Sequence, residues 1–185
     1  MKNDIAYTLV SEEEINETVT RIAAEIDRDY PDRSKGLLLL CILKGSVVFM
    51  GDLMKKISLP VEIDFMKVSS YGKDTQSSGR IKIHLDLNRS DVSECNILII
   101  EDVIDSGRTL SYLSEYLRLN GAKSVRTCTL LDKPERRNPA VTLQPDYTGF
   151  VIPNEFVVGY GLDYNEVYRN LPDIGILSPR IYAEE

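Results

Sequence analysis

The segment at residues 97–110, ILIIEDVIDSGRTL, constrains the fold of this chain more than any other. Its four leading apolar residues are typical of a buried strand, and they are followed at once by two acids, Glu101 and Asp102. The polar turn at residues 105–109 then opens a helix, so its N–H groups, its hydroxyls and the positive helix end can bind a phosphate. Carboxylates beside such a turn repel an anion unless they contact hydroxyls or a cation, which indicates a ribose or Mg²⁺. The alternative, an ordinary surface turn, leaves two acids at the end of a buried strand, which is costly without a ligand.

Strands and helices alternate along the rest of the chain. A capping box at Ser11 and Glu14 begins the first helix, which ends before Pro31. We predict strands at residues 37–43, 61–65, 81–87, 97–100 and 125–131, a last core strand at 156–159, and helices at 47–57 and from the turn to Asn120-Gly121. This order is typical of an α/β fold with a mainly parallel, twisted sheet flanked by helices. Ligands of such sheets bind at the carboxyl ends of the strands.

Length and composition favour one soluble domain. The chain has 185 residues, close to the size of one domain, and 43% of them are apolar. Its net charge of −7, from 22 basic and 29 acidic residues, disfavours non-specific binding to nucleic acids or membranes. No apolar run approaches the about 18 residues of a membrane span, and the N-terminus shows no signal-peptide core. The three cysteines form no CxxC pair, so we expect a cytoplasmic protein without disulfides or a zinc cage.

Several other reaction chemistries are disfavoured by the residues themselves. His84 is the one histidine and lies on the polar side of a predicted strand, so no second imidazole serves a Ser or Cys triad. The GxxxxGK[ST] pattern of nucleotide triphosphatases is absent, and Gly159-Tyr160-Gly161 lacks the third glycine of a dinucleotide-binding fingerprint.

The segment at 97–110 resembles the phosphoribosyl pyrophosphate (PRPP) binding motif of the type I phosphoribosyltransferases, in which two acids precede a D-S/T-G-x-T turn. The resemblance implies that Glu101 and Asp102 contact the ribose hydroxyls and help to hold Mg²⁺. It also implies that the turn binds the 5′-phosphate. The residues of this turn are Asp105, Ser106, Gly107, Arg108 and Thr109. Arg108 stands where many relatives have lysine, although either side chain can face a phosphate.

The segments LLDKP at 130–134 and FVVGYGLDYNE at 156–166 are similar to those of the hypoxanthine-guanine phosphoribosyltransferases, and the likeness extends over residues 39–176. It implies that Lys133 donates to the 6-oxo oxygen of a purine. Lysine has three donors and no acceptor, so it favours a carbonyl oxygen over an exocyclic amine. Without the resemblance, Lys133 reads equally well as a solvated loop cation.

The same likeness assigns four further residues to the site. Phe156 is implied to stack on the base, and an aromatic face suits a purine. The Val157 backbone is implied to contact the edge of the base. Asp163, beside the purine, is implied to hold a second Mg²⁺ through pyrophosphate and water, and Arg169 to contact the pyrophosphate. From spacing alone, Phe156 is also compatible with a core position, and Asp163 with Arg169 is compatible with a surface ion pair.

A second anion site is expected where the first buried strand ends, at Leu43-Lys44-Gly45. Backbone N–H groups between a strand and a helix suit an anion. The family uses this turn, with Lys44 and Gly45, for pyrophosphate, and there the Leu43–Lys44 peptide is implied to be cis. The alternative is a simple strand-to-helix turn.

The resemblance also implies how the chain is organised. One domain is expected over residues 1–185, with a core at about 36–150 and a small hood from the N-terminal segment and about 151–185. The polar loop at 69–80 is implied to be a mobile lid with Ser70-Tyr71 near its tip. Cleavage of the ribose C1–pyrophosphate bond creates oxocarbenium character that water would quench, so a lid has a chemical purpose.

These observations predict a Mg²⁺-dependent enzyme of purine salvage. It is expected to transfer the 5-phosphoribosyl group from PRPP to N9 of hypoxanthine and guanine, giving IMP or GMP and pyrophosphate. Asp105 is the expected general base, near purine N7. No nucleic-acid or membrane partner is expected, and the family suggests a homodimer or homotetramer. Two alternatives stay open: a PRPP- or nucleotide-sensing regulator of the same fold, and a transferase that prefers xanthine.

Overall fold

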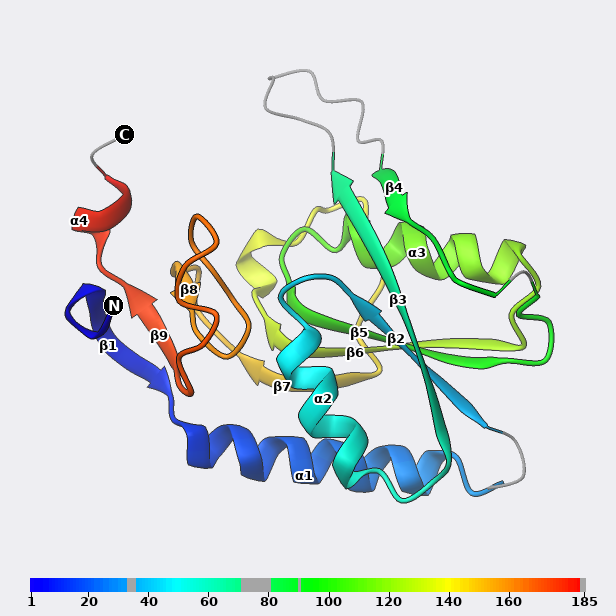
Figure 1. Ribbon diagram of the computed structural model, residues 1–185. Coiled ribbons are helices and arrows are strands. Elements are labelled where there is room, and N and C mark those ends of the chain that lie inside the picture. Colours follow the sequence, from blue (N-terminus) through cyan, green and yellow to red (C-terminus); the bar gives the residue numbers. More distant parts are fainter. Residues whose placement is uncertain (33–35, 71–80, 90, 184–185) are drawn as a thin grey trace.

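The computed structural model describes residues 1–32, 36–70, 81–89 and 91–183 as an α/β fold (Figure 1). Its strands are β1 (Ile5–Val10), β2 (Leu37–Ile42), β3 (Val61–Ser70), β4 (Ile81–Leu85), β5 (Asn96–Ile104), β6 (Ser124–Asp132), β7 (Tyr147–Val151), β8 (Val157–Val158) and β9 (Ile174–Leu177). Its α-helices are α1 (Glu12–Asp29), α2 (Val47–Lys56), α3 (Arg108–Leu119) and α4 (Pro179–Tyr182). No helix in these ranges is long and apolar enough to cross a membrane.

The larger sheet has six strands in the order β4-β3-β2-β5-β6-β7. All its neighbouring pairs are parallel except β3 with β4, which confirms the predicted mainly parallel sheet. All six residues of β2 are buried, because helices cover both faces of a parallel sheet. The carboxyl ends of β2 and β5 therefore open side by side at one edge of the core.

Alternate residues of the central strands feed two separate hydrophobic clusters. Leu39 and Cys41 face the cluster that contains buried residues of α1 and α2. Leu38 and Leu40 face the cluster of α3. The two-residue period of a strand thus assigns the two helix layers to opposite faces of the sheet, as Figure 1 shows.

A second sheet, of three strands in the order β1-β9-β8, is built from both ends of the chain. It lies beyond the carboxyl ends of the parallel strands (Figure 1). The prediction of a last core strand at residues 156–159 was wrong, because β8 pairs with β9 in this second sheet. One edge strand of the core sheet is β7, which the prediction missed. Thr148 and Gly149 interrupt the apolar pattern of β7, and a two-residue strand such as β8 carries no periodicity that would indicate its partner.

The predicted capping box of α1 is confirmed. The Glu14 backbone N–H donates to Ser11 Oγ at 3.3 Å, and the Ser11 N–H donates to Glu14 Oε2 at 2.8 Å. These bonds satisfy groups that a helix start otherwise leaves open.

We expect Ser11→Ala to lower the free energy of unfolding by about 1 kcal/mol, because the first turn of α1 loses its acceptor. Urea denaturation measures this change. Thr20→Ala in the same helix is the control, because the Thr20 hydroxyl donates to the Asn16 carbonyl within the helix and does not cap its start. This substitution should change the free energy of unfolding by no more than about 0.5 kcal/mol. Equal losses for the two variants would contradict the capping role.

Candidate active site

The predicted phosphate turn lies between β5 and α3. Strand β5 continues through Ile104, so Glu101 and Asp102 belong to its last residues, and the strand is longer than predicted. Helix α3 begins at Arg108, and its N-cap is Gly107 with a φ of 76°. A left-handed backbone of this kind favours glycine. The turn therefore directs the N-terminus of α3 toward the carboxyl edge of the sheet, where an anion is stabilised.

A cavity of about 560 Å³ lies against this turn. Its lining includes five predicted site residues: Glu101, Asp105, Ser106, Gly107 and Thr109. Two residues of the acid pair and turn lie outside the lining, because Arg108 is exposed and Asp102 faces the Lys44-Gly45 turn instead. The lining also lacks the residues predicted for the purine and the pyrophosphate, which are Lys44, Gly45, Lys133, Phe156, Val157, Asp163 and Arg169. Arg136 also lines the cavity, and the prediction did not include it.

The segment after β6 donates hydrogen bonds to backbone carbonyls of this turn. Arg137 donates to the Asp105 carbonyl at 2.7 Å and forms an ion pair with Asp132. The Asn138 N–H donates to the Ser106 carbonyl at 3.1 Å. Arg137 was also absent from the prediction; the sequence signal for it is the Arg136-Arg137 pair that closely follows Lys133. These hydrogen bonds set the turn through backbone groups and leave the Asp105 carboxylate available.

The Asp105 carboxylate lies between two cations. Lys133 Nζ is 3.9 Å from Asp105 Oδ1, and Arg136 Nε is 3.9 Å from Asp105 Oδ2. Asp105 Oδ1 is buried and has no hydrogen-bond partner among the described residues. Lys133 is buried, and desolvation lowers the pKa of its ammonium although Asp105 opposes the shift. An acceptor and a donor thus face the same region with hydrogen-bonding capacity left for a ligand.

Glu101 and Asp102 place two carboxylates together where solvent is scarce. Desolvation first, and then the neighbouring charge, raise the pKa of Glu101 well above its usual range. Desolvation also raises the pKa of Asp102, against a hydrogen bond from the Val103 N–H at 2.7 Å. Two neighbouring carboxylates resist being ionised at the same time because their charges repel. A bound cation removes that penalty. The donor set is all oxygen, which fits Mg²⁺ completed by phosphate oxygens.

The second predicted anion turn meets the first at Asp102. The Leu43–Lys44 peptide is cis, as the resemblance implied. A Cβ added to Gly45 would lie 1.5 Å from Asp102 Oδ2, so only glycine fits against this carboxylate. Lys44 is exposed, and its Nζ pairs with Glu166 at 3.0 Å.

Arg169 lies between β8 and β9 and also pairs with Glu166. Its Nη2 pairs with Asp163 Oδ1 at 2.8 Å and with Glu166 Oε2 at 3.3 Å. Lys44 and Arg169, two predicted pyrophosphate residues, therefore share Glu166. Asp163 is engaged by Arg169, and no group of three His, Cys, Asp or Glu side chains in the described ranges could hold a metal ion. Asp163 is thus not clustered with Glu101 and Asp102.

Two of the predicted purine residues, Phe156 and Val157, lie at the start of β8 in the second sheet. The Phe156 side chain is 39% exposed. Its ring stacks on Tyr182 at 5.3 Å and meets Tyr164 edge-on at 5.5 Å, so part of an aromatic face stays open. Val157 is buried, and its register partner in β9 is Ile176.

The predicted lid is only partly described. Ser70 ends β3, whereas Tyr71 and the rest of the loop to residue 80 lie outside the described residues. Ser69 lines the cavity, and its Oγ lies 2.7 Å from His84 Nε2. The one histidine therefore contacts a residue at the rim of the cavity.

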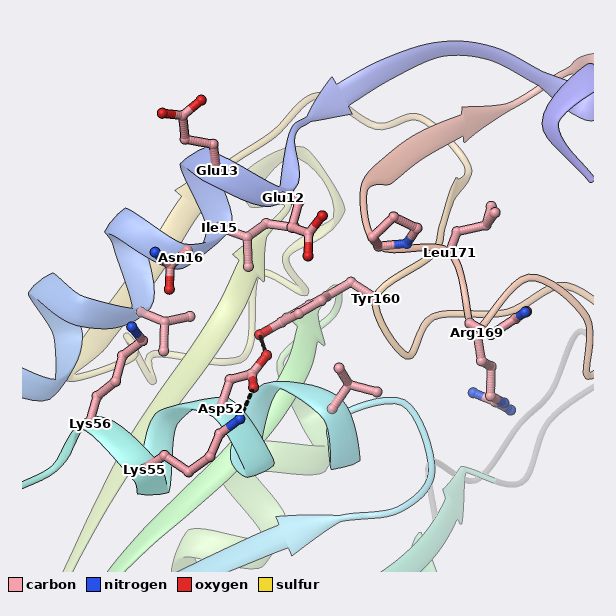
Figure 2. A pocket seen from close by; sticks show the side chains of 14 residues that line it. Glu12, Glu13, Ile15, Asn16, Asp52, Lys55, Lys56, Tyr160, Arg169 and Leu171 are labelled. Carbon is pink, nitrogen blue, oxygen red and sulfur yellow. Dashed lines mark hydrogen bonds and ion pairs between the residues drawn. The ribbon is translucent and has the colours of Figure 1, made fainter.

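A larger cavity, of about 850 Å³, lies between α1, α2 and the segment at 160–172. Figure 2 shows Tyr160 reaching into it toward Asp52. Arg169 is the one predicted site residue in its lining, and its guanidinium points away from Asp52. The smaller cavity, with five predicted residues, is therefore the candidate active site.

Comparisons with known proteins point to one family. The family model described as "Phosphoribosyl transferase domain" matches residues 9–165. The chain is 52% identical to the hypoxanthine-guanine phosphoribosyltransferase of Bacillus subtilis, over 98% of each chain. It is 55% identical to the bifunctional protein TilS/HprT of Listeria innocua, but spans only 28% of that relative. A crystal structure of a hypoxanthine phosphoribosyltransferase from Staphylococcus aureus superimposes with a TM-score of 0.91 at 45% identity, covering 98% of this chain and 96% of the other.

We expect Glu101→Gln to raise the melting temperature of the metal-free protein at pH 7 by about 2–4 °C. In a chain of this length, a gain of ~1 kcal/mol in the free energy of unfolding gives a shift of that size. A carboxylate whose pKa is raised on folding destabilises the folded state above that pKa, since the unfolded chain keeps the charge in water. As the pH falls through the raised pKa toward the ordinary value of about 4.3, both states take up the proton and the difference disappears.

Thermal melts in chelator at neutral pH and near pH 4 test this prediction. Glu94→Gln is the control, because Glu94 is exposed outside the cavity, and it should change little at either pH. A lower melting temperature for Glu101→Gln at neutral pH would contradict the electrostatic account.

Proposed function

Because the chain belongs to the phosphoribosyltransferase family, in its hypoxanthine-guanine branch, we propose that it transfers the 5-phosphoribosyl group of PRPP to N9 of hypoxanthine and of guanine. The products are IMP or GMP and pyrophosphate. The observation that carries the proposal is one cavity lined by Glu101 and by Asp105, Ser106, Gly107 and Thr109 of the turn, with Asp102 beside it against Gly45.

The PRPP end of the cavity works by positioning. The N–H groups at the start of α3 and the hydroxyls of Ser106 and Thr109 bind the 5′-phosphate. Glu101 and Asp102 accept from the ribose hydroxyls. Lys44, Gly45 and Arg169 bind the pyrophosphate, which replaces Glu166 as the anion between the two cations. Holding both ends of PRPP fixes ribose C1 for attack.

Magnesium is part of the proposal. Glu101 and Asp102 fit the ion because they offer only oxygen ligands, and a cation would favour the charged forms of carboxylates whose pKa values desolvation raises. Asp163 would hold a second Mg²⁺ through pyrophosphate and water, which is compatible with its ion pair to Arg169 and with its position apart from the other two acids. When bound, Mg²⁺ neutralises the charge that develops on the leaving pyrophosphate.

The purine end selects the base and accepts its proton. Lys133 donates to the 6-oxo oxygen, Phe156 stacks on the ring, and the Val157 backbone contacts the base edge. As purine N9 forms its bond to ribose C1, the C1–oxygen bond to pyrophosphate breaks, and the Asp105 carboxylate takes the proton from the purine. Lys133 and Arg136 flank this carboxylate.

The proposal extends to location and assembly. The three cysteines are free thiols and two of them are buried, which supports a reducing, cytoplasmic location. The family suggests a homodimer or homotetramer. The residues at 69–80 act as a lid in this proposal.

The first experiment is a steady-state assay with PRPP against hypoxanthine, guanine, xanthine and adenine. We expect turnover of hypoxanthine and guanine that chelator abolishes, because Lys133 selects a 6-oxo purine and the paired acids need a cation. Faster turnover of xanthine would revise the specificity. Tight PRPP binding without turnover of any base would identify a regulator instead.

We expect Asp105→Ala to lower kcat by about a hundredfold or more, the usual contribution of a general base. PRPP binding should stay largely intact, because Arg137 holds the turn through the backbone carbonyl of residue 105. Turnover and PRPP affinity are measured on the same variant, the latter by titration calorimetry. Equal loss of both would show that the Asp105 side chain holds the turn together.

A further inference from the structure

Residues 159–161 follow β8 and contact the proposed pyrophosphate turn at Gly45. Their backbone angles are unusual. Gly159, Tyr160 and Gly161 all have positive φ angles, of 98°, 51° and 100°. Such a conformation is unfavourable for tyrosine, so surrounding contacts must hold it. Two are backbone bonds: the Tyr160 N–H donates to the Leu171 carbonyl at 2.8 Å, and the Gly161 N–H donates to the Arg169 carbonyl at 2.9 Å.

Gly161 contacts both parts of the proposed pyrophosphate site. A Cβ added to Gly161 would lie 2.2 Å from the Gly45 carbonyl oxygen, so the two backbones touch directly. The Gly161 carbonyl in turn accepts from Arg169 Nη1 at 2.8 Å. A shift of Gly161 therefore moves Arg169 relative to the Lys44-Gly45 turn.

The Tyr160 side chain points to the opposite side of this backbone, into the larger cavity (Figure 2). It is buried, and its hydroxyl donates to Asp52 Oδ2 at 2.8 Å. The other oxygen, Asp52 Oδ1, accepts from Lys55 Nζ at 2.7 Å. Burial, and then Asp52, raise the pKa of Tyr160, so the phenol keeps its proton. Burial alone would raise the pKa of Asp52, but the hydrogen bonds from Lys55 and Tyr160 outweigh it and lower the pKa.

These contacts close a ring. Helix α2 follows the Lys44-Gly45 turn and carries Asp52 one and a half turns further along. From Asp52 the ring runs through the Tyr160 hydroxyl to Gly161, and from Gly161 back to the Gly45 carbonyl. The Asp52–Tyr160 bond is the one side-chain link in it.

We propose that the Asp52–Tyr160 hydrogen bond is a positioning element for pyrophosphate recognition, which holds Arg169 at the correct distance from the Lys44-Gly45 turn. Neither residue touches the substrate; both act through Gly161. This inference rests on the proposed function, because it assigns pyrophosphate to that turn. It names two residues outside the candidate active-site cavity as determinants of affinity for one substrate only.

The test removes a single hydroxyl. Tyr160→Phe should raise both the KM for PRPP and the dissociation constant for pyrophosphate with Mg²⁺ by about tenfold, the usual effect of losing a hydrogen bond to a charged group. The KM for hypoxanthine should change by less than about twofold. Pyrophosphate binding is measured by titration calorimetry, which needs no turnover.

Tyr147→Phe is the matched control. Tyr147 is also buried, and its hydroxyl donates to a carboxylate, Asp29 Oδ2, at 2.9 Å, away from the candidate active site. Its loss should lower the melting temperature as Tyr160→Phe does, without changing either PRPP or pyrophosphate affinity.

Variants of the acceptor complete the test. Asp52→Asn keeps an acceptor oxygen and should bind pyrophosphate within about threefold of the wild type, whereas Asp52→Ala should match Tyr160→Phe. The double variant of Asp52→Ala and Tyr160→Phe should be no worse than either single one, since both remove the same bond. Because Asp52 is only partly buried and Tyr160 is buried, the Asp52 variants test the bond even if Tyr160→Phe is poorly folded.

Unchanged pyrophosphate affinity in folded Tyr160→Phe or Asp52→Ala, beside a wild type that binds normally, would overturn the positioning role. Equal effects of Tyr160→Phe and Tyr147→Phe on pyrophosphate affinity would do the same, because the effect would then be general destabilisation. A wild type that neither binds pyrophosphate or PRPP nor turns over a purine would instead refute the proposed function itself.

Discussion

The paired carboxylates of Glu101 and Asp102 are the constraint on which the arrangement of the site depends. They stand at the end of a buried strand, where desolvation penalises their charge. Such a pair is tolerated in a fold because ligand binding compensates it, and stability is given up locally for that purpose. Every other proposed anion contact surrounds this pair: the turn before α3 on one side, and Gly45 against Asp102 on the other.

Two glycines allow neighbouring segments of the site to approach each other where a Cβ would not fit. At Gly45 and Gly161 a single Cβ would overlap Asp102 or the Gly45 carbonyl. The contact of Gly161 with Gly45 is made by backbone alone and has no rotamers to adjust, whereas Gly45 leaves room for the Asp102 side chain. The charges of Lys44 and Arg169 are then brought together across that contact by Glu166.

The parts of the fold that could be predicted carry local signals. The all-apolar β2 and the capped α1 are examples, because a continuous buried run and a Ser-x-x-Glu cap need no knowledge of distant residues. The sheet to which β8 belongs was predicted wrongly because its pairing with Ile176 and Gly175 is a long-range choice. The turn at residues 105–109 was predicted from its own residues, and it lies between β5 and α3. Arg137 was missed because its role depends on how the chain after β6 folds back onto that turn.

The small sheet and the core sheet share no strand in the described part of the chain. A hydrogen-bonded ladder between them would hold all their residues in one register, whereas here the two parts meet through a shared apolar cluster and through polar bonds between single residues. The Glu12 N–H donates to Asp173 Oδ1, and Tyr160 donates to Asp52. Both bonds join the second-sheet region to a helix of the α1–α2 layer rather than to a strand. In the proposed arrangement, the backbone contact of Gly161 with Gly45 and the bond of Tyr160 to Asp52 in that helix layer together place Arg169 over the core. Residues outside the candidate active-site cavity thus contribute to the geometry of the site.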